Sequence, residues 1–194
     1  MANPILRGFG SIARFSGRDG RDQFWPYAAV VVLAVFVFAA VALPLSMQGL
    51  FAEMEAFAVA HPEAATVHSS PGNYSIAIDA DHPLAPSPDL SGFFLTLTIM
   101  AILAVVLLAA AVSRRLHDCN RPAFLGLVPV AFLAGALILM PRLLAGVSGA
   151  AEPNLALFGL LFVNNALYLA ALLALVVQCV LEGTPGPNRY GPKP

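Results

Sequence analysis

Residues 92–112 read GFFLTLTIMAILAVVLLAAAV, and SRRLHD follows directly at 113–118. A helix needs about 20 consecutive apolar residues to cross the hydrocarbon core of a membrane. The first stretch contains no Asp, Glu, Lys, Arg or His, and charged residues begin as soon as it ends. This pattern predicts a membrane-spanning helix that ends at a polar surface.

The composition of the chain supports the same interpretation. Of 194 residues, 59% are hydrophobic and 11% are charged, with a mean hydropathy of +0.79. Soluble domains are about 45–50% apolar and about 25% charged. The net charge of −1 argues against a nucleic-acid partner, and two cysteines are too few for a disulfide framework. We therefore interpret residues 1–194 as a single integral membrane domain.

Three further stretches are apolar enough to span a bilayer, namely Trp25–Met47, Phe124–Met140 and Leu155–Leu181. Together with Gly92–Val112 they predict an all-α bundle of four transmembrane helices, with a long outer loop at residues 48–90. The third stretch has 17 residues and contains Pro129, so we expect a short or kinked span, with a re-entrant segment as the alternative. A cleaved signal peptide is an alternative for the first stretch, but signal peptides have a shorter apolar core.

The basic residues between these stretches predict the orientation of the chain. Nine of the ten Lys and Arg residues fall on one side of the predicted bundle, and Arg142 alone falls on the other. Because cytoplasmic segments are enriched in Lys and Arg, we expect both termini in the cytoplasm and the loop at 48–90 outside. The nine are Arg7, Arg14, Arg18, Arg21, Arg114, Arg115, Arg121, Arg189 and Lys193.

The segment before the first span has the spacing of an amphipathic helix. Its apolar residues are Ile5, Leu6, Phe9, Ile12 and Ala13. Such a helix would lie on the cytoplasmic headgroups, with its arginines attracted to anionic lipid. A disordered segment is the alternative, because the glycines at 8 and 10 weaken a helix.

The outer loop is acidic. Residues 50–58 fit a short amphipathic helix, and Tyr74–Asp79 alternates with period two, which predicts one strand of a small hairpin. Metal binding is one interpretation of its three histidines and neighbouring acids, but their spacing matches no tight ligand pattern. We therefore expect a solvated polar loop without a metal. The residues concerned are His61, Glu63, His68, Asp79, Asp81 and His82.

Polar side chains interrupt the middle of the fourth span, namely Asn164, Asn165 and Tyr168. The two amides fall near the predicted bilayer midplane, where such groups usually form hydrogen bonds between helices. Lining a path for a small solute is the alternative. The four stretches contain no ionisable Asp, Glu, Lys, Arg or His, which argues against an ion-coupled pump.

Three polar motifs flank the predicted spans on the cytoplasmic side. They read GRDGRDQFW at 17–25, SRRLHD at 113–118 and GTPGPNRYG at 183–191. Because each lies within a few residues of a span end, a four-helix bundle can bring them together. Paired arginines bind phosphate bidentately, so we expect a phosphate-bearing ligand, with Arg18 and Arg115 as anchors. The alternative is that these arginines set the topology and pair with Asp19, Asp22 and Asp118 for structural reasons. The candidate binding residues are Arg18, Arg21, Trp25, Arg114, Arg115, His117, Asp118, Asn188 and Tyr190.

Catalysis is the less favoured interpretation of the same motifs. His117 with Asp118 offers a base, and Cys119 offers a thiol. However, neighbouring residues on a helix point in different directions, and no complete catalytic or metal-binding set accompanies them. We therefore expect no enzymatic activity.

The three motifs resemble those of a bacterial inner-membrane family known as domain of unknown function 805. The resemblance covers almost the whole chain and implies a small multi-span inner-membrane protein, but no activity or catalytic residue. The chain departs from the family pattern at 122–125, at Lys193 and in its long outer loop. The matching residues are Phe15, Gly17, Arg18, Arg21, Phe24, Trp25, Arg114, Arg115, Leu116, His117, Asp118, Gly183, Thr184, Gly186, Asn188, Tyr190 and Gly191.

Two functional hypotheses follow from the sequence. The first is a non-catalytic bundle whose cytoplasmic face binds an anionic lipid headgroup, another phosphate-bearing ligand or a partner membrane protein. A homo-oligomer is compatible with it, and no cofactor is expected. The second is permeation of a small solute or ion along Asn164, Asn165 and Tyr168.

Overall fold

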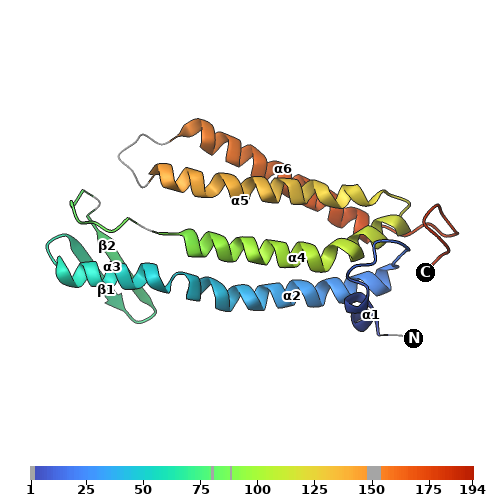
Figure 1. Cartoon of the computed structure of the whole chain (residues 1–194), viewed down its shortest axis with the longest axis horizontal. Coiled ribbons are helices and arrows are strands. Elements are labelled where there is room, and N and C mark those ends of the chain that lie inside the picture. Colours follow the sequence, from blue (N-terminus) through green and yellow to red (C-terminus); the bar gives the residue numbers. More distant parts are fainter. Residues whose placement is uncertain (1–2, 80, 88, 148–153) are drawn as a thin grey trace.

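The computed structural model describes residues 3–79, 81–87, 89–147 and 154–194. Within these ranges, four helical segments are long and apolar enough to cross a membrane. They run side by side along the long axis of the molecule (Figure 1). The segments are α2 (Arg21–Ser46) with α3 (Gln48–Ala60), α4 (Ser91–Asp118), the 3₁₀ turn η1 (Ala123–Gly126) with α5 (Leu127–Val147), and α6 (Leu155–Val180). The prediction of a mostly helical chain with four spans is confirmed.

The outer surface of the bundle is apolar. In each span, only 6–11% of the most hydrophobic stretch is buried inside the chain. Large apolar side chains such as Phe36, Ile102 and Phe162 are more than half exposed. A contiguous apolar surface of this extent is rare on water-soluble monomers, whereas lipid tails solvate it well. The chain is therefore a multi-pass membrane protein.

The buried core lies toward one end of the bundle. Phe24, Tyr27 and Val31 of α2 pack there against Ala111 of α4 and Cys179 of α6. The Tyr27 hydroxyl donates a hydrogen bond of 2.7 Å to the Leu107 carbonyl, which satisfies its polar atom inside the core. Both chain termini lie at this end, while α3 and the hairpin lie at the other (Figure 1). We call the two ends the motif end and the hairpin end.

The N-terminal helix α1 (Pro4–Gly10) is shorter than the helix predicted at 5–13. The Asn3 side chain accepts a hydrogen bond from the Ile5 amide and caps its start. It ends where the Ser11 amide bonds to the Gly8 carbonyl, in a region that glycine makes costly to keep helical. The Phe9 ring packs edge-on against Tyr27, so α1 is fixed across the motif end of α2.

The first span begins at Arg21 rather than at Trp25, and two span ends also differ from the prediction. The helix α4 continues through the central motif to Asp118 rather than ending at 112, because acidic side chains neutralise its arginines there. The third span is longer than predicted: α5 extends past Met140 to Val147 and contains Pro141 as well as Pro129. Pro129 falls in the first turn of α5, where its missing N–H removes no helical hydrogen bond.

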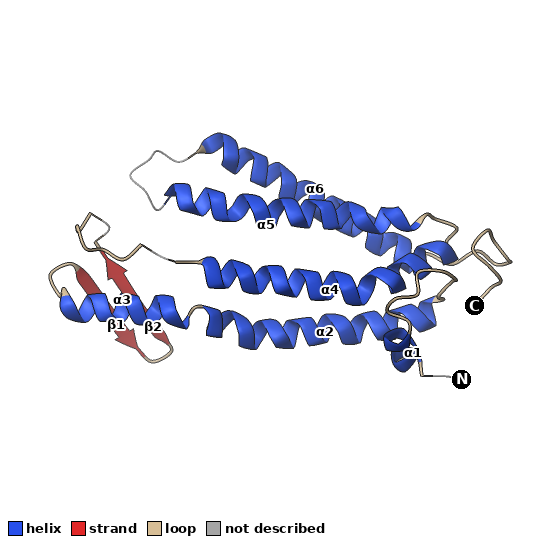
Figure 2. Cartoon of the chain, viewed as in Figure 1, coloured by secondary structure: helices blue, strands red, loops and turns tan. Residues whose placement is uncertain are grey.

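A hairpin forms the cap of the hairpin end (Figure 2). Strands β1 (Ala65–Ser70) and β2 (Asn73–Ile78) pair antiparallel, which confirms the strand predicted at 74–79 with a shift of one residue. Pro71 and Gly72 form the turn, and the φ of +82° at Gly72 is the conformation that a type II turn requires at its second central residue. The preceding helix α3 is longer than the 50–58 predicted.

Candidate functional site

At the motif end, the segment between α1 and α2 lies against the end of α4. The Ser113 hydroxyl donates a hydrogen bond to the Phe15 carbonyl, and the Asp19 amide donates one to the Arg114 carbonyl. Gly17 has φ +94°, which lets the segment turn here with little strain. The first and central motifs are therefore in direct contact, as their positions at span ends predicted.

Arg18 joins all three motifs. Its guanidinium donates to Asp118 Oδ1 from Nε (3.0 Å) and from Nη2 (2.8 Å). It also donates to the Thr184 carbonyl and hydroxyl and to the Gly186 carbonyl, at 2.8–3.0 Å. Both Arg18 and Asp118 are 5% exposed or less. Arg18 therefore ties the C-terminal motif to the end of α4.

Arg115 is fully buried and bound by the protein itself. Its Nη1 lies 2.5 Å from Asp118 Oδ2, and its Nε donates to the Cys179 carbonyl at 2.9 Å. Its Nη2 donates to the Leu181 carbonyl. We expected Arg115 to hold a ligand together with Arg18, but the geometry gives it a different role. It joins the ends of α4 and α6, because adjacent carbonyls and Asp118 satisfy its donors.

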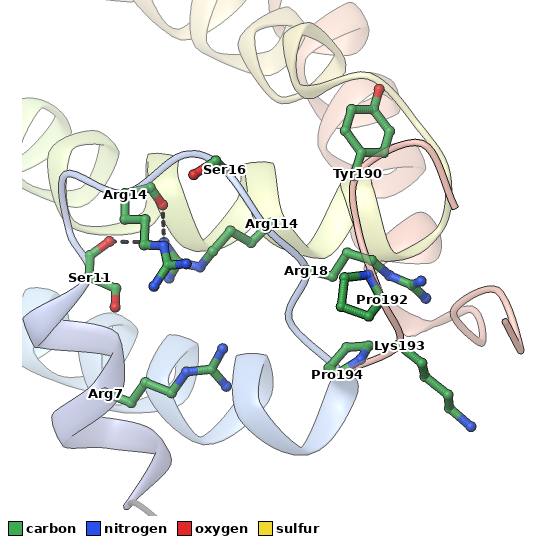
Figure 3. A pocket seen from close by; sticks show the side chains of 11 residues that line it. Arg7, Ser11, Arg14, Ser16, Arg18, Arg114, Tyr190, Pro192, Lys193 and Pro194 are labelled. Atoms are coloured by element: carbon green, nitrogen blue, oxygen red, sulfur yellow. Dashed lines mark hydrogen bonds between the residues drawn. The ribbon is translucent and has the colours of Figure 1, made fainter. Parts of the chain in front are cut away.

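A second carboxylate, Asp19, binds two arginines. Arg114 Nε donates to Asp19 Oδ2 at 2.6 Å, and Arg7 Nη2 donates to Asp19 Oδ1 at 3.0 Å. Arg114 Nη1 also donates to the carbonyls of Ser11 and Arg14 (Figure 3). The central motif thereby fixes the α1–α2 connection as well as the C-terminal motif.

His117, Asn188 and Tyr190 form a stacked corner beside Arg18. The rings of His117 and Tyr190 lie parallel, with centroids 3.8 Å apart. The Asn188 amide group donates to the His117 carbonyl and the Thr184 hydroxyl, each at 2.9 Å. His117 Nδ1 lies 3.2 Å from the Gly17 carbonyl, so this nitrogen carries the proton in that contact. These side chains hold the C-terminal motif in a compact turn.

The remaining two predicted residues lie at the edge of this arrangement. Arg21 forms an exposed ion pair with Glu182 at 2.9 Å. Trp25 packs edge-on against Phe24 and is 36% exposed. Trp25 lies near the start of α2, and tryptophan near the end of a span is typical of the membrane–water interface.

The paired charges at the motif end do not balance. Two carboxylates, Asp19 and Asp118, pair with four arginines: Arg7, Arg18, Arg114 and Arg115. The excess of two positive charges lies beside a pocket of about 220 Å³ (Figure 3). Arg14 and Lys193 line the same pocket, and none of its described lining residues is acidic. The lining is Arg7, Ser11, Arg14, Ser16, Gly17, Arg18, Arg114, Tyr190, Pro192, Lys193 and Pro194.

The three motifs that meet here lie within the part of the chain that matches a known protein family. The sequence model of one family, described as "Protein of unknown function (DUF805)", matches residues 12–192. The chain belongs to the DUF805 family. Neither the comparison with curated proteins nor that with solved structures gave a match.

Sequence reasoning missed part of this DUF805 pocket. Arg7, Arg14 and Lys193 line it, although none belongs to the three motifs. Arg7 belongs to α1 and Arg14 to the connection between α1 and α2, and only the fold shows that this connection returns to α4. Two signals were available: the amphipathic spacing at 5–13, and the distribution of basic residues that placed all three on the same side of the bundle.

The intramembrane polar residues of this DUF805 chain lie between helices. Asn164 Nδ2 donates to the Phe132 carbonyl of α5 at 2.9 Å, and a Cβ at Gly135 would meet its Oδ1 at 2.6 Å. Asn165 is half-buried. Tyr168 lines an apolar crevice of about 370 Å³ between α4, α5 and α6. Asn164 thus joins α5 to α6.

The groups that the sequence offered for catalysis have protein partners in the DUF805 fold. Asp118 forms two ion pairs, and His117 is stacked against Tyr190. The Cys119 thiol lies 3.4 Å from the Gln178 carbonyl. Burial raises the pKa of this thiol above its ordinary value, so it is protonated at neutral pH and a weak nucleophile.

Proposed function

We propose that this chain is a non-catalytic membrane protein whose motif end binds the phosphate headgroup of an anionic lipid. In this proposal the motif end faces the cytoplasm of a bacterial inner membrane, as the distribution of basic residues favours. The observation that carries it is the pocket at the motif end, which five basic residues line together with two serines. Guanidinium groups, ammonium groups and hydroxyls are the donors that phosphate requires.

The buried ion pairs make this pocket a preorganised one. Arg18 and Arg114 each donate to a carboxylate and to backbone carbonyls, so their positions are fixed before any ligand arrives. Arg7 is shared between Asp19 and the pocket. An anion therefore meets a positive potential without having to order these side chains, which lowers the entropic cost of binding.

An apolar crevice beside the pocket favours a lipid over a soluble phosphate. Arg14 and Ser16 line the basic pocket, while Phe15 between them lines the crevice among α4, α5 and α6. On α4, Arg114 likewise lines the basic pocket, while its neighbour Ser113 lines the crevice. A lipid whose phosphate occupies the pocket would have apolar surface for an acyl chain directly beside it.

The lipid proposal predicts a loss of binding when the pocket is neutralised. We expect the double variant Arg14→Gln with Lys193→Gln to retain phosphatidylglycerol less well than the parent. At about 1 kcal/mol for each basic residue near a charged membrane surface, the two changes should lower affinity roughly 30-fold. Native mass spectrometry from a mild detergent, with phosphatidylglycerol and phosphatidylcholine offered together, measures this.

A matched control removes the same charge from the same end of the molecule. Arg21 and Arg121 are exposed and do not line the pocket, so Arg21→Gln with Arg121→Gln should bind lipid like the parent. Added inorganic phosphate distinguishes the source of the ligand. Competition at millimolar phosphate would support a soluble phosphate ligand over a lipid. Equal losses in both double variants would refute the pocket.

The orientation is tested separately. We expect alkaline phosphatase, which is active only outside the cytoplasm, to be active when fused at residue 70. A fluorescent protein that matures only in the cytoplasm should fluoresce when fused after Pro194. The physical reason is the nine-to-one distribution of basic residues. An alkaline phosphatase and a fluorescent protein fused at each position give opposite signals. A cytoplasmic residue 70 or an external C-terminus would overturn the orientation.

A further inference from the structure

We propose that His61, Glu63 and His82 bind a Zn²⁺ ion at the hairpin end. His61 Nδ1 lies 3.2 Å from Glu63 Oε1, and His82 Nε2 lies 4.0 Å from the same oxygen. The ligand atoms of all three residues lie within 4.8 Å of one another. In a tetrahedral zinc site with bonds of about 2.0–2.1 Å, neighbouring ligand atoms are about 3.4 Å apart. The three side chains therefore need to move by only about an ångström.

The hairpin brings these residues together. Strands β1 and β2 pair in one antiparallel register, from Ala65–Ile78 at the base of the hairpin to Ser70–Asn73 beside its turn. His61 and His82 lie beyond this ladder, where the Ala64 amide donates to the His61 carbonyl at 3.0 Å and the His82 amide donates to the Asp79 carbonyl at 3.2 Å. The Asp79 amide extends the pairing by donating to the Ala64 carbonyl at 2.8 Å. The hairpin and the hydrogen bonds at its base therefore bring the two imidazoles together, with ring centroids 4.9 Å apart.

Aromatic packing holds the two imidazoles in place. The buried Phe57 ring of α3 lies 4.9 Å from the His61 ring and 5.5 Å from the His82 ring, and the two imidazoles are themselves 4.9 Å apart. Glu63 is mostly exposed, so the site is open to solvent on one side. An apolar base with an open fourth position suits a metal that keeps one water ligand.

The charge of the surrounding loop favours a cation. Residues 48–90 contain six acidic residues and no Lys or Arg. The Glu63 side chain is mostly exposed, so its carboxylate can reach an ion from the solvent side. Two imidazoles with one carboxylate form a ligand set typical of Zn²⁺. Zinc would bind Nε2 of His82, so Nδ1 of the same ring would carry the proton. Nδ1 could then no longer accept the hydrogen bond of 3.3 Å from the Leu84 amide.

The bound ion would link the end of α3 to the segment that leads from the hairpin into α4. His61 follows α3 directly, and His82 lies between the hairpin and α4. Zinc should therefore lower the rate at which backbone amides of the hairpin exchange with solvent, since opening the hairpin separates its ligands.

The test uses full-length protein without a polyhistidine tag, stripped with EDTA and titrated with ZnCl₂ against a chromophoric chelator. We expect one Zn²⁺ per chain. His82→Ala should weaken zinc binding by at least about tenfold. Removing a residue that only hydrogen-bonds to a metal ligand already lowers metal affinity by about 10–100-fold, and removing the ligand itself should lower it more. His68→Ala is the matched control, since His68 is an exposed residue of β1 paired with Ser75. It should bind like the parent.

Glu63→Gln provides a second variant that keeps the shape of the side chain. It should also weaken binding while leaving the far-ultraviolet circular dichroism unchanged. Hydrogen exchange with and without ZnCl₂ should show protection of residues 65–78 in the parent and in His68→Ala. Parent-like zinc binding by both His82→Ala and Glu63→Gln would overturn the site, as would binding of an adventitious ion only, without defined stoichiometry or protection of the hairpin.

Discussion

Replacing Asp118 with Asn is expected to destabilise the protein by about 3–5 kcal/mol, the usual effect of removing one partner from a buried ion pair. Asp118 is the carboxylate that both Arg18 and Arg115 contact, at 2.8 and 2.5 Å. Arg115 is completely buried, and Arg18 is 5% exposed. Asn keeps the shape of the side chain but leaves two buried guanidinium groups without a counter-charge. Thermal unfolding of the detergent-solubilised protein, followed by circular dichroism, measures the effect.

The exposed pair Arg21–Glu182 provides the control for Asp118. Glu182→Gln removes the same charge close to the same end of α6, but its side chain is 84% exposed and that of Arg21 is 49% exposed. Surface pairs contribute little because water and salt screen them. We therefore expect no measurable shift in Tm. A Tm for Asp118→Asn equal to that of Glu182→Gln would refute the structural role of the Asp118 pairs.

The four spans could be predicted because a charge-free apolar run has few alternatives in a chain this hydrophobic. Their ends could not, because the end of a helix depends on the partners of its last residues. Charges at 114 and 115 predicted the end of the second span, yet the helix continues to Asp118. Asp19 and Asp118 form ion pairs with both arginines within the folded chain. The two guanidinium groups therefore need no contact with water, and the helix can continue past them.

The convergence of the motifs could be predicted from topology, but not the partner of each arginine. Arg114 and Arg115 are neighbours in sequence, and successive residues on a helix point about 100° apart. Arg114 consequently contacts Asp19, while Arg115 contacts Asp118 and α6. A pattern of paired arginines alone does not distinguish a ligand from an internal carboxylate almost a hundred residues away.

The proximity of His61, Glu63 and His82 could not be predicted from their spacing along the chain. Spacing along the chain separates His61 from His82 by twenty residues and predicted a solvated loop. The hairpin returns the chain toward His61, and hydrogen bonds at its base (Ala64 amide to His61 carbonyl, His82 amide to Asp79 carbonyl) set the position of each histidine. A pattern of alternating residues predicts a strand but not these bonds.

Gly183→Ala is expected to disrupt the motif end by overpacking it. A Cβ at Gly183 would overlap the Asp118 carboxylate. This carboxylate cannot move aside, because Arg18 holds one oxygen and Arg115 the other. Forcing an additional methyl group into a well-packed site typically costs about 1–3 kcal/mol. We expect a Tm clearly below that of the parent in the same detergent.

Gly186→Ala is the matched control for Gly183→Ala. Gly186 lies three residues further along the same motif, and a Cβ there would meet no atom within 4 Å. Its carbonyl, which accepts a hydrogen bond from Arg18, is unchanged by the substitution. Stability should therefore stay within about 0.5 kcal/mol of the parent, as for other substitutions that break no packing or hydrogen bond. If both alanine variants unfolded at the same temperature, the close approach of Gly183 to Asp118 would not contribute to the stability of the protein. A loss confined to Gly183→Ala would show that this glycine is needed because the carboxylate occupies the space of its missing side chain.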